Sequence, residues 1–155
     1  MTKANKARLH ELEAIKLRLK HPTFPEHCIP YTVWSDTSAN ALTKCVTEFI
    51  NMSGYQAERI STQGTYIEGK KLKVADITRP SAGKYIPTQG TKGSADISST
   101  IHGRSVKIEI KQKDKQSEHQ KAYQLSIEKA GGVYIIVRTF DEFIIWYDNF
   151  VASLK

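Results

Sequence analysis

The chain has 155 residues, of which 39% are hydrophobic and 25% charged, and its formal net charge is +7. This length suits one domain with its own core and is too short for two comfortable ones. No stretch approaches the roughly eighteen apolar residues of a membrane span, and no apolar signal-peptide core follows the basic N-terminus. We therefore expect a cytoplasmic protein without membrane contact.

The positive charge is concentrated in two segments. Residues 69–92 contain six Lys or Arg side chains against the single acid Asp76, and residues 1–20 contain six against two. A basic surface attracts polyanions, of which nucleic acid is the commonest in a cell, although it can also serve only to keep a protein in solution. Cys28 and Cys45 lie far apart and form no zinc-ligand spacing, which argues against a structural zinc site.

The first thirty residues are expected to form a basic helix and a proline-rich connector ahead of a main domain, residues 31–155. Residues 3–20 are predicted to be helical, with one apolar stripe formed by Leu9, Leu12, Ile15 and Leu19. Three prolines then predict an extended connector over residues 21–30. The stripe must be buried somewhere, so the helix either packs on its own domain or reaches across to a partner subunit.

One helix and several strands are expected next. Asp36 and Ser38 are both good N-caps, so a second helix is predicted from there to residue 53. Loose alternation of apolar and polar residues predicts strands over residues 56–63 and 66–77. The prolines and glycines of residues 79–93 predict a segment that is largely loop.

The C-terminal part alternates helix, strand and helix. The S-x-x-Q capping box at Ser117 and Gln120 predicts a helix that runs to residue 130. The apolar, β-branched run of residues 133–138 is typical of a buried central strand. Thr139 is a suitable N-cap for a last helix that is mainly core. The order of elements predicts an α/β fold, a sheet covered by helices.

The clearest local signal is a β-hairpin. Ser94–Ile101 and Arg104–Gln112 flank the two-residue turn His102-Gly103, a combination typical of a type I′ turn. Such a turn pairs residues whose numbers sum to 205. Asp96 is therefore expected to face Glu109, with the two Cβ atoms about 4.5–5.5 Å apart.

This pairing predicts a candidate active site on the polar face of the hairpin. Like charges directly opposite destabilise a sheet unless something neutralises them, and Mg²⁺ prefers carboxylate oxygens. Lys111 follows on the same face, where an ammonium can position a water and stabilise charge at a phosphate, as metal-assisted phosphodiester hydrolysis requires. The alternative is a solvent-facing hairpin on which water tolerates Asp, Glu and Lys, since E-x-K is a common tripeptide. The matched acidic pair, the helix and strand that follow it and the basic segments around it favour the catalytic interpretation.

These residues resemble the PD-(D/E)XK nuclease superfamily. The motifs that carry the resemblance are Gly93-Ser94-Ala95-Asp96, Ile108-Glu109-Ile110-Lys111, Gln120 and Gly131-Gly132, in the family's order of elements over residues 40–151. Within the superfamily the protein is most similar to the VRR-NUC group in its small phage and prophage form, in which Arg59 with Thr62-Gln63-Gly64 also resembles the early-strand pattern. Ala95 stands where the superfamily motif has proline. The resemblance implies a restriction-endonuclease-like central mixed β-sheet flanked by helices.

The resemblance also implies roles for individual residues. Three ligands for Mg²⁺ or Mn²⁺ are implied: Asp96, Glu109 and the backbone carbonyl of Ile110. Lys111 would serve the attacking water. Glu48, on the first core helix, matches a glutamate that adds a metal ligand or orients water. Gln120 matches a polar residue that supports the site, although the capping box explains it equally well.

The function that follows is a metal-dependent DNA endonuclease, with a preference for flapped, junction or branched DNA that rests on the resemblance alone. Basic side chains around the hairpin are expected to contact phosphates: Arg59, Lys70, Lys71, Lys73, Lys84, Lys92, Lys113 and Lys115. A homodimer is expected because cutting two strands of a branched substrate needs two sites. The alternatives are a catalytically silent DNA-binding or assembly module with the same fold, and a sequence-specific restriction-type enzyme, for which the sequence offers no recognition element.

Overall fold

The computed structural model describes residues 1–23, 25–28, 30–61, 65–69, 71–74, 77–80, 82–87 and 90–154. Of residue 26 and of the strand residues between 71 and 80 it describes the backbone alone. The predicted Thr62-Gln63-Gly64 pattern lies outside the described residues. No helix in the described ranges is long and apolar enough to cross a membrane.

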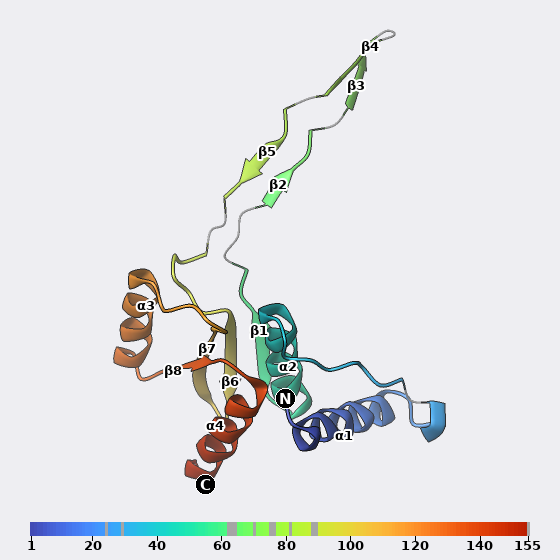
Figure 1. Cartoon of the computed structure of the whole chain (residues 1–155), viewed down its shortest axis with the longest axis vertical. Coiled ribbons are helices and arrows are strands. Elements are labelled where there is room, and N and C mark those ends of the chain that lie inside the picture. Colours follow the sequence, from blue (N-terminus) through green and yellow to red (C-terminus); the bar gives the residue numbers. More distant parts are fainter. Residues whose placement is uncertain are drawn as a thin grey trace.

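A four-stranded mixed sheet organises the fold (Figure 1). Its strands are β1 (Gln56–Arg59), β6 (Ile97–Ile101), β7 (Arg104–Ile110) and β8 (Val133–Val137), in the order β1-β6-β7-β8. The β1–β6 and β6–β7 pairs are antiparallel, and the β7–β8 pair is parallel. The expected mixed α/β sheet flanked by helices is therefore present.

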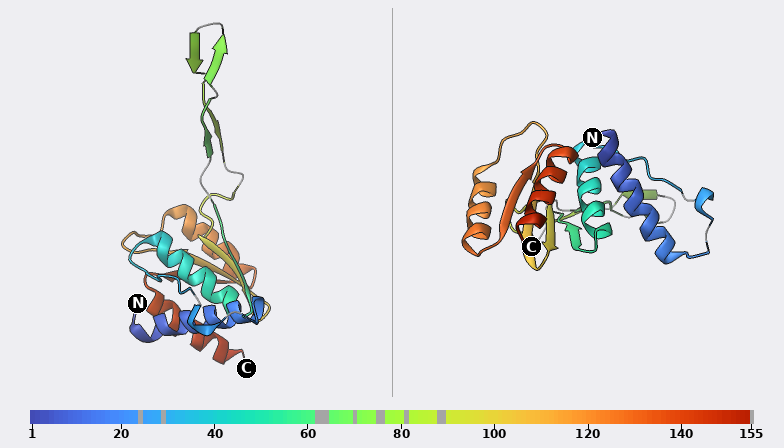
Figure 2. Two further views of the ribbon diagram at one scale, coloured as in Figure 1. Left: turned by 90° about the vertical axis from the view of Figure 1, so that its right-hand side faces the viewer. Right: turned by 90° about the horizontal axis from the view of Figure 1, so that it is seen from below.

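Four helices cover this sheet: α1 (Lys3–Lys20), α2 (Ala39–Met52), α3 (Glu118–Lys129) and α4 (Phe140–Ser153). All four begin where a side chain caps the first turn. In each case a hydroxyl accepts from the backbone N–H three residues on, and these hydroxyls belong to Thr2, Ser38, Ser117 and Thr139. Figure 2 shows α3 on one side of the sheet and α4, α2 and α1 on the other. The helix predictions are confirmed to within about two residues.

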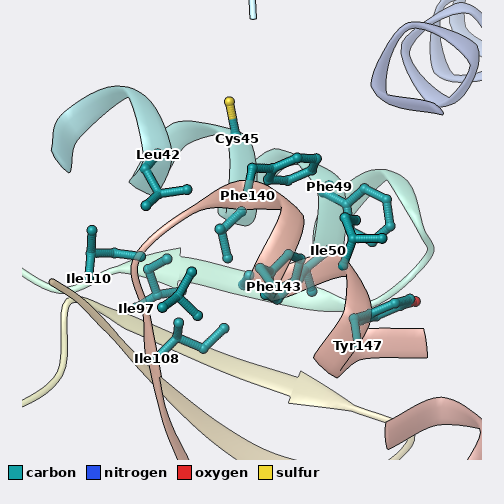
Figure 3. Packing of buried hydrophobic residues seen from close by; sticks show 14 of the residues in the cluster. Leu42, Cys45, Phe49, Ile50, Ile97, Ile108, Ile110, Phe140, Phe143 and Tyr147 are labelled. Atoms are coloured by element: carbon teal, nitrogen blue, oxygen red, sulfur yellow. The ribbon is translucent and has the colours of Figure 1, made fainter. Parts of the chain in front are cut away.

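The core fills the space between the sheet and helices α2 and α4 (Figure 3). Ile97, Ile108 and Ile110 project from the sheet toward aromatic rings on the two helices. The Phe49 ring packs edge-on against Phe143, with 5.8 Å between the ring centroids. Because β7 alternates its side chains across the sheet, these apolar residues leave Glu109 on the opposite face, beneath α3.

The β6–β7 hairpin has the predicted register and turn. Ile97 pairs with Ile108 and Ile101 with Arg104, so the paired numbers sum to 205 as expected. His102 and Gly103 have φ values of 48° and 74°, and two positive φ values define the type I′ family. The turn thereby fixes which residues of β7 face the core.

Helix α1 packs on its own domain. Leu9 is fully buried in the same core as Phe49, and the Arg8 guanidinium forms a two-pronged ion pair with Asp148 of α4. Ile15 and Leu19 of the predicted stripe are exposed. Residues 1–30 therefore share the core of residues 31–155. Within the connector, residues 26–28 form one 3-10 turn, so its prediction as wholly extended was wrong.

Strand β8 lies at the edge of the four-stranded sheet, and its prediction as a central strand was wrong. Its apolar pattern has another cause. Helix α4 contacts one face of β8 and α3 the other, so both faces of an edge strand are largely covered. Ile136, at 39% exposed, marks where this cover is incomplete.

The segment between β1 and β6 projects from the domain as two short antiparallel pairs (Figures 1 and 2). Strands β2 (Thr65–Ile67) and β5 (Lys84–Ile86) form the pair nearer the domain, and β3 (Lys71–Val74) and β4 (Ile77–Pro80) form the pair farther out. The prediction of one strand over residues 66–77 was therefore wrong. The prediction of a largely loop segment over residues 79–93 missed β5 and the end of β4. We call the β2–β5 pair the ribbon.

Candidate active site

The candidate site lies where β6 and β7 meet the start of α3. Glu109 is 2% exposed, and it is the one acidic residue that is buried in the described part of the protein. Asp96 lies just before the first paired residue of β6, and its Oδ2 accepts a 2.9 Å hydrogen bond from the backbone N–H of Ile110. This bond fixes the Asp96 carboxylate beside β7.

Two donors converge on one oxygen of Glu109. The Gln120 carboxamide donates to Oε1 at 2.5 Å, and the Lys111 ammonium lies 3.4 Å from the same atom. The other oxygen, Oε2, is buried without a hydrogen-bond partner among the described residues. A buried polar atom left without a partner costs free energy, and it marks a position for a ligand, an ion or a water.

Gln120 fulfils both roles that its sequence position allowed. Its carbonyl oxygen accepts from the Ser117 backbone N–H at 2.9 Å and completes the capping box of α3. Its amide nitrogen donates to Glu109. The first turn of α3 is thereby tied to the carboxylate by one side chain.

Burial and charge act on Glu109 in the same direction. Burial, the larger cause, and the nearby Asp96 carboxylate together raise the pKa of Glu109 from 4.5 to about 7, against the opposing effects of Lys111 and Tyr134. A bound cation would offset both causes, the loss of hydration and the repulsion from Asp96. It would therefore favour the ionised form of Glu109 near neutral pH.

Tyr134 is a site residue that sequence reasoning missed. It lies on β8, and burial followed by the charge of Glu109 raises the pKa of its phenol to about 12. Its hydroxyl is buried and makes no well-formed hydrogen bond to a described residue, yet it lies close enough to lower the pKa of Glu109. The sequence offers one indication of this residue, because the Tyr134 hydroxyl is the one polar side-chain group in the apolar run Val133–Val137.

Gly93 brings the segment that leads into β6 against the backbone of α3. Its φ is +82°, and a Cβ there would lie 2.5 Å from both atoms of the His119 backbone carbonyl. Any side chain at this position would therefore separate the start of α3 from the loop before Asp96. The glycine of the Gly93-Ser94-Ala95-Asp96 motif has a steric reason to be there.

The residues present fit a hard divalent cation. Asp96 and Glu109 are adjacent carboxylates, and one of the four oxygens is buried without a partner among the described residues. No group of three or more His, Cys, Asp or Glu side chains with metal-binding geometry exists in the described ranges. Two carboxylates can still hold Mg²⁺, because this ion completes its shell with water and substrate phosphates.

Among the described residues, no hydrogen bond or ion pair joins Glu48 to Asp96 or Glu109. Glu48 forms a 3.2 Å ion pair with Lys16 of α1. Helix α2 lies beside β1 at Asn40, whose side chain accepts from Arg59, and Glu48 lines the same hollow as these two residues. Glu48 lies eight residues further on, about 12 Å along the helix axis.

The predicted phosphate-binding residues lie around the site and on the projecting segment. Lys84, Lys92, Lys113, Lys115 and Arg59 are exposed. Lys70 lies outside the described residues, as do the side chains of Lys71 and Lys73. Lys92 lies in the loop ahead of β6, and Lys113 and Lys115 lie in the loop that follows β7, so these three exposed cations flank the carboxylate pair in sequence.

The geometry provides two adjacent carboxylates, one ammonium and one carboxamide in a largely buried setting with basic side chains around it. Such a set can hold a divalent cation and orient a nucleophile toward a phosphate. Neither a scan against protein-family models nor a search of curated proteins finds a match to this sequence.

Proposed function

We propose that the protein is a Mg²⁺- or Mn²⁺-dependent deoxyribonuclease with a restriction-endonuclease-like fold. The observation that carries the proposal is the buried Glu109, which lies beside a second carboxylate and has one oxygen without a partner among the described residues. Leaving such a pair uncompensated is costly, and a bound cation removes the cost.

A structural role for Glu109 as a protonated acid is the competing explanation, and its neighbours argue against it. Both groups at Oε1, the Gln120 amide and the Lys111 ammonium, are hydrogen-bond donors. Donors favour the ionised carboxylate, which accepts at both oxygens, over the acid, which must itself donate at one. Burial and the Asp96 charge favour the acid, whereas the donors favour the carboxylate, and a cation bound at Oε2 would shift the balance to the carboxylate.

Each residue would then contribute a distinct part of the chemistry. Asp96, Glu109 and the Ile110 carbonyl would hold the cation, which when bound supplies Lewis acidity and a water of lowered pKa. Lys111, with a side chain only 15% exposed, would orient the attacking water and stabilise the charge that develops on the phosphate. Gln120 would keep the Glu109 carboxylate in position, and Ile110 would do the same for Asp96 through its N–H.

A nuclease assay tests the proposal directly. The purified full-length protein would be incubated with flapped, junction, single-stranded and plain duplex DNA in Mg²⁺, in Mn²⁺ and in chelator. Cleavage is expected with either metal and none with chelator. Cleavage that persists in chelator would refute the metal-dependent mechanism, and failure to cleave any substrate would favour a silent DNA-binding module.

The proposal includes a homodimer as the form that makes paired cuts. The described residues hold one carboxylate pair of this kind, so two strands of one junction would need a second subunit. Light scattering on the full-length protein at tens of micromolar, alone and with a junction, tests this part. A monomer that makes paired cuts would exclude it.

A further inference from the structure

The ribbon exposes apolar and aromatic side chains that the fold does not use. Tyr66 and Tyr85 pair directly across β2 and β5, so their rings lie on one face, and they are 62% and 60% exposed. Ile67 and Ile86 are also exposed, at 50% and 44%. Every residue of both strands is exposed.

This arrangement has no structural explanation within the described residues. An isolated two-stranded hairpin is at best marginally stable in water, and it needs a third strand or a packed element to be firmly ordered. The described residues provide neither, since the ribbon projects away from the sheet and its helices (Figure 1). Exposed apolar surface concentrated on one projecting element marks a contact with another molecule.

Charge identifies the kind of molecule. Residues 60–92 contain six Lys or Arg side chains and two acids, Glu68 and Asp76. A second copy of this basic segment would be repelled, whereas a polyanion would be attracted. Tyrosine rings add a specific capability, because bases stack on aromatic side chains when their faces are accessible. Bases in an intact duplex are already stacked on one another, so the tyrosine face suits an unpaired strand.

We infer that the ribbon binds the unpaired strand of a DNA substrate, with Tyr66 and Tyr85 stacking on bases and Lys84 contacting the backbone. The inference rests on the proposed function for the identity of the nucleic acid, and it deepens that function by naming the element that would hold the unpaired strand. The substrate is DNA with a single-stranded segment next to a duplex, as at a flap or a branch. The ribbon leads from the end of β1 and returns ahead of β6. Because Arg59 pairs with Ile97, the ribbon projects from the end of the sheet at which Asp96 lies.

A binding experiment without catalysis tests the inference. Fluorescence anisotropy in chelator would compare the wild-type protein with the double variant Tyr66→Ala/Tyr85→Ala on labelled flap, single-stranded and blunt duplex DNA. The double variant is expected to lose at least about tenfold in affinity for the first two and less than about twofold for the duplex. Tyr31→Ala is the matched control, because it removes a tyrosine that is 56% exposed outside the ribbon, and no change is expected.

Salt dependence separates stacking from charge. The double variant should keep the wild-type slope of log affinity against log salt, since it removes no charge. Lys84→Ala should reduce that slope by about 0.7–0.9. Wild-type affinity of the double variant for flap DNA would overturn the inference, as would an equal loss on blunt duplex. A fall in molecular mass of the double variant in light scattering would also overturn it, by assigning the tyrosines to a protein interface.

The two proposals fail in different ways. Normal binding by Tyr66→Ala/Tyr85→Ala together with metal-dependent cleavage by the wild type would remove the ribbon inference and leave the nuclease. Tyrosine-dependent binding of flap DNA without cleavage in any metal would retain the ribbon inference and remove the nuclease.

Discussion

Glu109 and Tyr66 both lie on β-strands, but one is 2% exposed and the other 62%. Around Glu109 a sheet, a helix cap and an ion pair hold the neighbouring side chains of Asp96, Gln120 and Lys111 in place. Around Tyr66 the support comes from its cross-strand neighbour Tyr85 and the backbone beside Gly83. Catalysis requires groups that are already in position when the substrate binds. Binding of an unpaired strand can instead use side chains on an element with few contacts, which can adjust to the strand.

The first way to test this contrast is stability, where the largest difference is expected. Phe49→Ala should lower the free energy of unfolding by about 3–5 kcal/mol, because it leaves a cavity between α2 and α4. Tyr66→Ala should change it by less than about 0.5 kcal/mol, since the ring is exposed. Urea denaturation followed by circular dichroism measures both. A loss above about 2 kcal/mol for Tyr66→Ala would show that the ribbon is part of the cooperative fold.

Catalysis should separate the two regions next. Lys111→Ala is expected to reduce the single-turnover cleavage rate by about 10²–10³-fold while leaving DNA affinity within about threefold, because in the proposed mechanism the ammonium beside Glu109 acts at the reacting phosphate. Lys107→Ala is the control, since Lys107 lies on the same strand and donates to Ser98 instead. A Lys111→Ala protein that cuts at the wild-type rate would remove the lysine from the mechanism.

The pH dependence of stability tests the strain at Glu109. The pKa of Glu109 is about 7 in the folded protein and near 4.5 in the unfolded chain. Between these pH values the folded protein therefore keeps a proton on Glu109 that the unfolded chain has lost. Stability in metal-free buffer should therefore fall as pH rises from about 4.5 through 7, by on the order of 2–3 kcal/mol, and should level off above. Glu109→Gln should flatten this dependence.

Metal provides the control for the same measurement. Mg²⁺ at pH 8 should raise the melting temperature of the wild type and not that of Glu109→Gln, because binding to the folded state stabilises it. An equal increase in both proteins would place the cation elsewhere.

The smallest expected effect concerns the capping box. Ser117→Ala and Gln120→Ala each remove one of its bonds and should each cost about 1 kcal/mol of stability. Only Gln120→Ala also removes the donor to Glu109, so only this variant should lose about tenfold in Mg²⁺ affinity, measured by calorimetry. Equal metal affinity in the two variants would reduce Gln120 to a helix cap.

Local signals predicted the parts of the molecule that local chemistry determines. Ser38, Ser117 and Thr139 mark their helix starts because each hydroxyl caps its own first turn. The register of β6 and β7 followed from His102-Gly103 because a two-residue turn leaves one pairing. The same register predicted that Asp96 lies beside Glu109. In the structure the paired residues of β6 begin at Ile97, and Asp96 is held instead by the hydrogen bond from the Ile110 backbone N–H.

Long-range packing decided the features that the sequence could not predict. Nothing local indicates that residues 65–67 pair with residues 84–86, so the alternation of residues 66–77 resembled one strand. The buried run of β8 reflects helices on both of its faces rather than a central position. Glu48 pairs with Lys16 of α1, and no pattern within α2 reveals that partner.

The contact at Gly93 has a consequence for how this protein can vary during evolution. The charged residues of the site are obvious targets of selection, but a methyl group at position 93 would meet the carbonyl of His119 without touching any of them. The backbone conformation, at φ +82°, disfavours other residues as well. Descendants of this protein that keep the carboxylate pair should therefore keep this glycine. A lineage that replaces it should also show substitutions at Asp96 or Glu109. The reason is that a displaced α3 would take the Gln120 donor away from Glu109 and disrupt the proposed site.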